Sequence, residues 1–498
     1  MLARSVHFEF APRHPFIDKM SEQHRPKVLV AGAGGSIGSV VSRALAKEYD
    51  VVALVGSHVQ LQKREPGLTL SWRSCEPFSR RDVEAAITGC DYIIYLFHTR
   101  GRTARLDQAE CKDMDLLIAD NVARAASRLG VKQIIYLGML IQEGNVTLGP
   151  LERSNEVIEA LSFYGTPLTV LRAGLVVSPG GNALRLLANI ATRLPIVLVP
   201  QWATKPKQPI ALPDVIRAIR FCLANKETKN NAYDIGGPQV LTCREMLRNV
   251  ADVLNKKQII IVVPYLPARL YGWYLRLLNQ QVHPVLIKLA IKYLGHNSVV
   301  RSNPVQEFIE KDAVLPRQAF ELCIKEWAEL PHNPRQPFLK KYIEGLRSMS
   351  NVRSIQRVPL PPGRNATWVG DTYFQWLPRF TRRFLVCEVD AHGTCRYYNR
   401  FPRLHLLTLR FMKELSSPDR RMYFITEGLL AKGHDTLIPR LEFRDVLNGR
   451  YTIVALHDYM PVLPWGLFLV TQAVMHLIVM FNFQKYMAKM EPASPQKT

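Results

Sequence analysis

The sequence predicts an α/β protein with a doubly wound parallel sheet, a small substrate lobe, and a strand-rich α+β region that ends in a long apolar helix. Three observations predict this class. A buried strand enters a glycine-rich turn and an amphipathic helix at residues 28–45. Strand-like and helix-like segments then alternate to about residue 240. After a proline-rich stretch the pattern changes to short strands.

The glycine-rich turn is the first candidate site. Its glycines have the spacing Gly-x-x-Gly-x-x-Gly between an apolar strand at residues 28–31 and a helix. Such glycines allow a tight turn, close approach of a pyrophosphate, and close packing of helix on strand. The helix start adds unpaired N–H groups. A second apolar strand at residues 51–55 completes a βαβ unit, which favours a dinucleotide site over a purely structural turn. The predicted cofactor contacts here are Gly32, Gly35, Ser36, Ile37 and Gly38.

The alternating elements predict a parallel sheet with right-handed crossovers. Strands are expected at Val28–Ala31, Val51–Val55, Tyr92–Leu96, Gln133–Leu137 and Leu168–Leu171, and helices at Ser36–Lys47, Ser79–Thr88, Ala109–Leu129 and Ser154–Leu161. Ligands of such sheets lie at the carboxyl ends of the strands. Phe97 and Gly138 follow or end two of these strands and are therefore further candidate cofactor contacts.

Charge and cysteine usage limit the function classes. The 498 residues carry a net charge of +23, which suits either nucleic acid or an anionic membrane surface. The basic residues are spread along the chain, so nucleic acid is the disfavoured partner and peripheral membrane contact stays open. No Cys-x-x-Cys pair or histidine cluster has zinc spacing, so no metal site is predicted. Eight cysteines without a pairing pattern suit a reducing, cytoplasmic location.

A series of short motifs in order carries a family resemblance. They are Gly32-x-x-Gly-x-x-Gly38, Tyr136-Leu-Gly138, Leu171-Arg-Ala-Gly174, Gln208-Pro-Ile-Ala211, Tyr233-Asp-Ile-Gly-Gly-Pro238 and Leu241-Thr-Cys-Arg-Glu-Met246. The series resembles the NmrA-like atypical short-chain dehydrogenases, which include a bacterial type with an extra C-terminal domain. The resemblance covers about residues 27–330. It implies a Rossmann fold, NAD(P) binding and a compact substrate lobe.

The domain organisation follows from these patterns. We expect a disordered tail at residues 1–26, the Rossmann domain with its lobe at 27–330, a linker at 331–363, and an α+β domain at 364–498. Strands of the last domain are predicted at Arg383–Val389, Thr394–Tyr398, Leu404–Phe411, Met422–Thr426 and Arg450–Leu456. Several strands followed by a long helix suit a helix-grip, START-like lipid-binding fold, and a plain α+β cap explains the same pattern.

The residues that usually carry the chemistry of the resembled family are missing. Its reaction uses a Tyr-x-x-x-Lys pair and a serine. Gly138 or Met139 occupies the serine position, and no such pair occurs near residues 150–156. Tyr164, the next tyrosine, has Leu168 four positions on. His98, at the end of the third expected strand, is the alternative acid/base candidate. Arg172 and Glu156 are expected in structural ion pairs rather than on a substrate.

The second strand bears on the choice between NADP and NAD. Because the strand ends in Val55-Gly56, it has no acidic residue to hold a ribose 2′-hydroxyl. His58 and two further basic residues, Lys63 and Arg64, follow it, so NADP is favoured over NAD. Glu76 is the candidate for the acid that family members direct at the adenine.

Three classes of function stay open. The first is an oxidoreductase or isomerase acting on a small apolar molecule; without the Tyr/Lys pair, turnover itself is undecided. The second is a non-catalytic dinucleotide-binding sensor or assembly factor. The third is a lipid or quinone carrier that acts through the C-terminal domain.

The C-terminal helix bears on localisation. It is predicted over Leu463–Met490, and its stretch Val462–Phe483 has no charged residue and is long enough to cross a bilayer. A single span would place the two domains on opposite sides of the membrane, so we expect a packed helix or one docked at a membrane surface. Gln472 and His476 are four residues apart and share a face, which is expected to meet water or a polar cavity.

Overall fold

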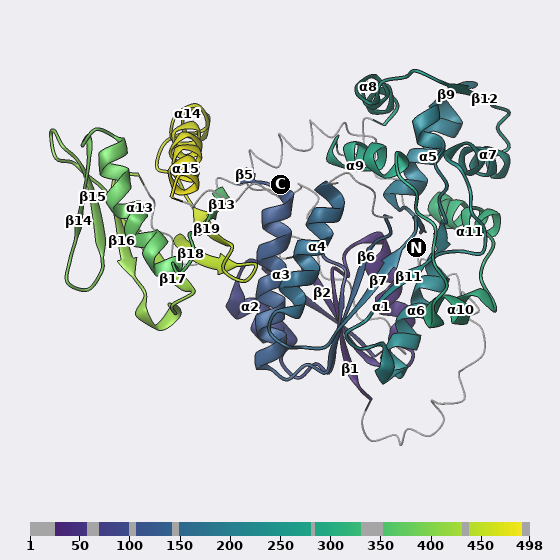
Figure 1. Cartoon of the computed structure of the whole chain (residues 1–498), viewed down its shortest axis with the longest axis horizontal. Coiled ribbons are helices and arrows are strands. Elements are labelled where there is room, and N and C mark those ends of the chain that lie inside the picture. Colours follow the sequence, from purple (N-terminus) through teal and green to yellow (C-terminus); the bar gives the residue numbers. More distant parts are fainter. Residues whose placement is uncertain are drawn as a thin grey trace, which may run out of the picture.

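The structure, a computed structural model, describes residues 25–56, 69–98, 106–141, 149–279, 284–329, 352–430 and 438–490. Its central element is a parallel sheet in the order β11-β7-β6-β4-β1-β2-β3. The strands are β1 (Lys27–Ala31), β2 (Asp50–Gly56), β3 (Leu70–Cys75), β4 (Tyr92–Tyr95), β6 (Gln133–Met139), β7 (Leu168–Ala173) and β11 (Ala232–Ile235). The predicted doubly wound fold is confirmed (Figure 1).

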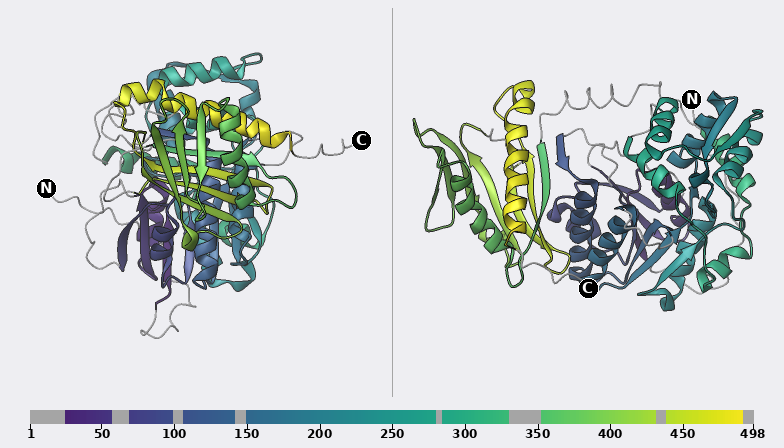
Figure 2. Two further views of the ribbon diagram at one scale, coloured as in Figure 1. Left: turned by 90° about the vertical axis from the view of Figure 1, so that its left-hand side faces the viewer. Right: turned by 45° about the horizontal axis from the view of Figure 1, so that its top comes forward.

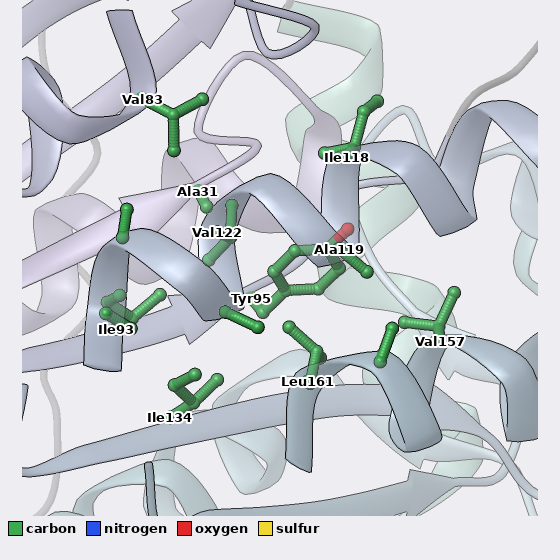
Figure 3. Packing of buried hydrophobic residues seen from close by; sticks show 14 of the residues in the cluster. Ala31, Val83, Ile93, Tyr95, Ile118, Ala119, Val122, Ile134, Val157 and Leu161 are labelled. Carbon is green, nitrogen blue, oxygen red and sulfur yellow. The ribbon is translucent and has the colours of Figure 1, made fainter. Parts of the chain in front are cut away.

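Helices cover both faces of this sheet because successive strand residues point to opposite sides. Leu29 packs in the cluster formed with α2, α3 and α4, whereas Val28 and Val30 pack in the cluster formed with α1, α6 and α10. The helices are α1 (Ser36–Leu45), α2 (Arg80–Ile87), α3 (Cys111–Arg128), α4 (Gly149–Ser162), α6 (Leu212–Ala224) and α10 (Pro304–Glu310). Figure 3 shows the first cluster, in which the ring of Tyr95 lies among Ala119, Val122 and Leu161.

The substrate lobe lies beyond the carboxyl ends of these strands. It contains α5 (Asn182–Arg193), α7 (Cys243–Val253), α8 (Ala268–Leu278), α9 (Pro284–Leu294), α11 (Pro316–Glu329) and the strand pairs β8 (Val176–Val177) with β10 (Ile210–Ala211) and β9 (Ile196–Pro200) with β12 (Ile259–Val263). A capping box opens α7, where the Thr242 hydroxyl accepts from the Glu245 N–H and the Glu245 carboxylate accepts from the Thr242 N–H.

A second sheet forms the C-terminal part, in the order β14-β15-β16-β17-β18-β19-β13-β5. Its elements are β5 (Leu106–Ala109), β13 (Val352–Pro359), α13 (Ala366–Phe380), β14 (Leu385–Val389), β15 (Cys395–Asn399), β16 (His405–Phe411), β17 (Arg420–Glu427), β18 (Arg440–Val446), β19 (Tyr451–Tyr459), α14 (Trp465–Val470) and α15 (Gln472–Ala488). Neighbours pair antiparallel except β13 with β5. The strand-rich domain with a terminal apolar helix is confirmed.

Two boundaries differ from the sequence expectation. The stretch predicted as a linker, residues 331–363, contains β13, so the second sheet begins at Val352. β5 comes from the middle of the Rossmann region and joins this sheet by pairing with β13. Ile355 and Ile453 also lie in the core cluster that contains α3. The two parts are therefore packed together through a shared sheet edge and a shared core, and the START-like form of the second part stays a prediction.

The terminal helix packs by its polar face. The chain breaks it into α14 and α15 at Thr471, where φ is −118° and ψ is −84°. The His476 ring nitrogen lies 2.9 Å from the Ser354 hydroxyl of β13, and the Gln484 amide donates to the Arg357 carbonyl at 2.9 Å. The face shared by Gln472 and His476 thus lies against the sheet rather than in water.

This packing predicts an acid-sensitive contribution to stability. Burial lowers the pKa of His476 from 6.5 to about 4. At a pH between these two pKa values, the unfolded state binds more protons than the folded state. The contribution of His476 to the free energy of unfolding is therefore complete above its unfolded-state pKa and is lost as the pH falls toward its folded-state pKa. We expect the wild type to lose about 2 kcal/mol more stability between about pH 7 and pH 5 than His476→Gln, whose amide can still bond Ser354.

Urea unfolding of both proteins at the two pH values measures this difference. Buried carboxyls such as Asp113, whose pKa burial raises to about 6, act in the opposite direction. They are common to both proteins and cancel in the comparison. Parallel stability–pH curves for the two proteins would contradict a titrating His476.

Candidate functional site

The three glycines of the first turn have different surroundings. Gly32 has φ +99°, and a Cβ there would lie 2.9 Å from the Leu96 carbonyl oxygen. A Cβ on Gly38 would lie 2.3 Å from the Gly32 carbonyl oxygen, because α1 packs closely on the turn. A Cβ on Gly35 would meet only that same oxygen, at an ordinary 3.5 Å. Gly32 and Gly38 are thus required by the fold, whereas Gly35 leaves space open above the turn.

The start of α1 faces this open space. Gly35 is the N-cap residue, with φ −82° and ψ 165°, and no side chain caps this helix end or places an acid in its first turn. The N–H groups of the first turn have no acceptor within a helix, and the helix dipole is positive there. Ser36 and Ile37 line the adjoining cavity. Free donors, a positive helix end and room for a ligand together fit the pyrophosphate of a dinucleotide.

The cavity continues from the turn into the substrate lobe. Its volume is about 280 Å³. It passes the strand ends at His98, Gly138 and Ala173 and is then walled by side chains of α5, α7, α8 and α9. Most of the side chains by which the lobe lines the cavity are apolar, and they include Leu187, Met246, Leu275, Leu289 and Leu294. A ligand that extends from the glycine turn would thus meet an apolar compartment.

His98 lines the cavity, and the carboxylate of Asp115 lies close to its imidazole ring. Its Nδ1 is 4.0 Å from the carboxylate of Asp115, a buried residue of α3. The Arg153 guanidinium of α4 donates to the same carboxylate at 2.6 Å. The imidazole side chain is 43% exposed, which leaves it accessible from the cavity. His98 thus follows β4 and lines the cavity, while its role as an acid or base stays a prediction; Asp115 and Arg153 are additions that the sequence did not predict.

Two buried tyrosines lie near His98. The Tyr136 hydroxyl is 3.1 Å from the Ser154 hydroxyl, and its ring centroid is 6.3 Å from that of His98. Burial raises the pKa of Tyr136 to about 12 and that of Tyr95 well above its ordinary value. Both phenols are therefore neutral near pH 7 and cannot act as bases. Ser154 and Tyr136 come from different elements, so no spacing along the chain could have paired them.

Other predicted site residues are placed as follows. Gly138 lines the cavity, and a Cβ there would meet the Tyr136 ring at 2.9 Å. Phe97 packs its ring edge-on to Tyr95, 5.8 Å between centroids. Glu76 accepts from Arg353 of β13 at 3.0 Å, so it has a partner in the C-terminal sheet. His58 lies outside the described residues.

Arg172 and Glu156, which the sequence predicts in structural ion pairs, have such partners, and Tyr164 also has a structural partner. Arg172 donates to Asp234 on the neighbouring strand at 2.6 Å. Glu156 accepts a two-pronged interaction from Arg357, at 2.5 and 2.8 Å. The Tyr164 hydroxyl donates to Asp120 at 2.8 Å. Within the described ranges no group of three or more histidine, cysteine or acidic side chains could hold a metal ion.

Comparison with known proteins finds a family model that matches the first part of the chain. Residues 32–161 match the family model described as NAD(P)H-binding. This segment is similar to NAD(P)H-binding domains. The match includes the glycine turn, His98, Asp115 and Arg153, so the cavity described above begins within the matched segment.

Two curated proteins are similar in sequence. Auxiliary protein GraX of Staphylococcus aureus is 31% identical over 145 residues, which are 29% of this chain and 43% of that protein. The (4-alkanoyl-5-oxo-2,5-dihydrofuran-3-yl)methyl phosphate reductase of Streptomyces griseus is 24% identical over 230 residues, 46% of this chain and 74% of that enzyme. This chain thus spans less than half the length of GraX.

Solved structures resemble the fold more loosely. A nucleoside-diphosphate-sugar epimerase from Staphylococcus aureus covers 59% of this chain and 99% of its own at a TM-score of 0.48 and 15% identity. A Citrobacter triphenylmethane reductase complexed with NADP(H) covers 60% and 99% at a TM-score of 0.46 and 14% identity.

Proposed function

We propose that this protein is an NAD(P)H-dependent reductase that acts on an apolar small molecule. One observation carries the proposal. A single cavity begins at the dinucleotide turn, passes a histidine with an acid behind it, and ends in an apolar compartment. The NAD(P)H-binding family and the similarity to a curated reductase support it.

In such a reaction each group of residues has a separate role. The glycine turn and the N–H groups at Ser36 and Ile37 hold the pyrophosphate, and the bound dinucleotide supplies a hydride. The apolar side chains of α5, α7, α8 and α9 bind the substrate and exclude water. His98 donates the proton that accompanies the hydride and regains one from solvent. Asp115, itself fixed by Arg153, orients the imidazole.

The cofactor form belongs to the proposal as well. Among the residues that the structure describes, none places an atom within 4 Å of a Cβ built on Gly56 at the end of β2. No acid ends β2 to hold a 2′-hydroxyl. We therefore propose NADP as the preferred cofactor, with NAD as the alternative.

Calorimetric titration with NADPH and NADH, followed by turnover assays, tests the proposal. We expect tighter binding of NADPH, and loss of NADPH absorbance when apolar quinones or α,β-unsaturated ketones are added. If the protein binds NADPH but oxidises it with no compound of either class, the proposed reductase activity is contradicted and a binding role is favoured. Absence of binding would contradict the site itself.

His98→Gln tests the proton donor. The amide keeps the size and polarity of the side chain but cannot release a proton, so kcat is expected to fall on the order of 10²-fold. NADPH affinity should stay unchanged, because the pyrophosphate is held by the turn. His392→Gln, at an exposed histidine of the C-terminal sheet, is the matched control and should behave as wild type. An unchanged kcat in His98→Gln would remove His98 from the reaction.

A further inference from the structure

The terminal helix exposes apolar side chains where water would select polar ones. Val470, Met475 and Phe481 are 70%, 59% and 56% exposed, and Leu467, Val474, Leu477 and Ile478 add to the same outer surface. Its polar residues His476 and Gln484 instead point into the protein. A helix of a water-soluble surface has the reverse arrangement. We call this surface the α15 stripe.

A second apolar stripe lies on α8 in the substrate lobe. Leu270, Trp273 and Leu277 recur at helical spacing and are all exposed, Trp273 by 65%. Tyr265, in the turn that precedes the helix, is 96% exposed. The opposite side of α8 faces the protein interior, where Tyr271 and Leu275 are buried and line the cavity. We call this surface the α8 stripe.

The two stripes occupy the same side of the molecule. Figure 1 shows α8 and the α14–α15 pair along one edge, the upper edge of that view, although they are far apart in sequence. The left view of Figure 2 shows both helices running along that edge rather than away from it. Two separated apolar stripes on helices that lie along one edge fit a broad, flat apolar phase better than the groove of a single partner.

Charge complements this geometry. Arg269 and Arg276 are exposed on α8, and Lys485 and Lys489 are exposed at the end of α15. Neither α8 nor the segment Trp465–Ala488 contains an acidic residue. Within the described part of the chain these four cations form no ion pair, although Lys485 lies 4.3 Å from the centroid of the Phe481 ring. Cations beside exposed aromatic and aliphatic side chains are the composition of helices that lie at anionic lipid surfaces.

We propose that this edge of the protein docks on an anionic lipid bilayer, with α8 and α14–α15 lying in the headgroup region. By length and composition the 24-residue segment Trp465–Ala488 could cross a membrane. Its inner side, however, belongs to the core of the second sheet, where Phe483 and Met487 are fully buried. The helix therefore lies on the membrane rather than across it.

Docking has a consequence for the cavity. The helix that carries the α8 stripe is also a wall of the cavity, so the apolar compartment would lie next to the bilayer. A lipid-soluble substrate would then reach it without crossing water. This step rests on the proposed function, whereas the docking itself rests only on the two surfaces.

Co-sedimentation of the full chain with vesicles tests the docking. We expect binding to equimolar phosphatidylcholine and phosphatidylglycerol and much weaker binding to phosphatidylcholine alone. Met475→Glu and Trp273→Glu should each lower the bound fraction at limiting lipid at least about tenfold, since each places a negative charge among lipids of the same sign. Leu322→Glu, at a 44% exposed leucine of α11 away from that edge, is the matched control and should bind as wild type.

Fluorescence quenching by brominated lipid locates the contact. Lipid-dependent quenching should fall in Trp273→Phe, which keeps an apolar ring, while its sedimentation stays unchanged. Equal binding of all variants, or no binding by wild type, would overturn the proposal. So would a wild-type dimer that dissociates in Met475→Glu, because a second copy would then cover the stripe. NADPH titration of the same variants should be unchanged, which separates failure of docking from failure of the proposed function.

Discussion

Gly35→Asp is expected to abolish dinucleotide binding without unfolding the protein. The new carboxylate projects into the open space above the turn and repels the pyrophosphate, for which we expect about a thousandfold loss of affinity, or about 4 kcal/mol. The fold should tolerate it because a Cβ at this position meets only the Gly32 oxygen at 3.5 Å. The backbone of Gly35 is extended, and aspartate is a favoured N-cap residue.

Gly38→Ala is the matched comparison, three residues along the same turn. Its single added methyl group would lie 2.3 Å from a backbone oxygen, so we expect a loss of about 2 kcal/mol of stability or more. Calorimetry with NADPH and urea unfolding of both variants separate a ligand-facing glycine from a packing glycine. Wild-type NADPH affinity in Gly35→Asp would move the site away from this turn. Tighter binding of NADH than of NADPH by wild type would reverse the proposed cofactor preference.

The parallel sheet was predictable because its strands are buried on both faces. Segments such as Val28–Ala31 and Leu168–Leu171 are short and apolar apart from the single polar Thr169, which is β-branched. The structure extends them by only one or two residues as β1 and β7. β3 and β18 were missed because their sequences, LSWRSC and RLEFRDV, mix charged with apolar residues. In β18 these charges, Glu442 and Arg444, are buried against each other, which no local pattern reveals.

The sequence predicts which site residues lie at the end of each strand, but it does not predict which residues of other elements contact them. The position of His98 follows from chain order, because it comes shortly after β4, the strand beside β1. Asp115 and Arg153 belong to α3 and α4. Asp115 reaches His98, and Arg153 reaches Asp115, only when both helices pack on the sheet. The ion pair of Glu76 was also not predictable from the sequence. Its partner Arg353 comes from the second sheet, so the ion pair depends on how the two parts dock.

A buried ionic cluster joins the two parts in addition to the shared sheet edge and core. Arg444 of β18 is 1% exposed and donates to Glu442 at 2.7 Å, to Asp120 at 2.9 Å and to Asn121 at 2.6 Å. Asp120 and Asn121 belong to α3 of the Rossmann part. Burial alone would raise the pKa of Glu442, but the cations Arg444 and Arg420 lower it well below its usual value. Glu442 is therefore ionised, and its charge is stable only while these arginines are present.

Arg444→Leu is therefore expected to cost about 3–5 kcal/mol of stability, because it leaves carboxylates buried without their main partner. Arg450→Leu is the matched control at the same contact between the parts. Arg450 pairs with Glu159, but the two side chains are 56% and 39% exposed, so we expect a change within about 0.5 kcal/mol.

Urea unfolding followed by circular dichroism compares these variants with the double variant Arg444→Leu/Glu442→Leu. The double variant should recover part of the loss, since it removes one of the stranded charges together with its partner. A similar small loss for Arg444→Leu and Arg450→Leu would contradict the cluster's role in joining the two parts. A double variant that loses the sum of both single losses would show that packing, rather than the unpaired charge, accounts for the effect.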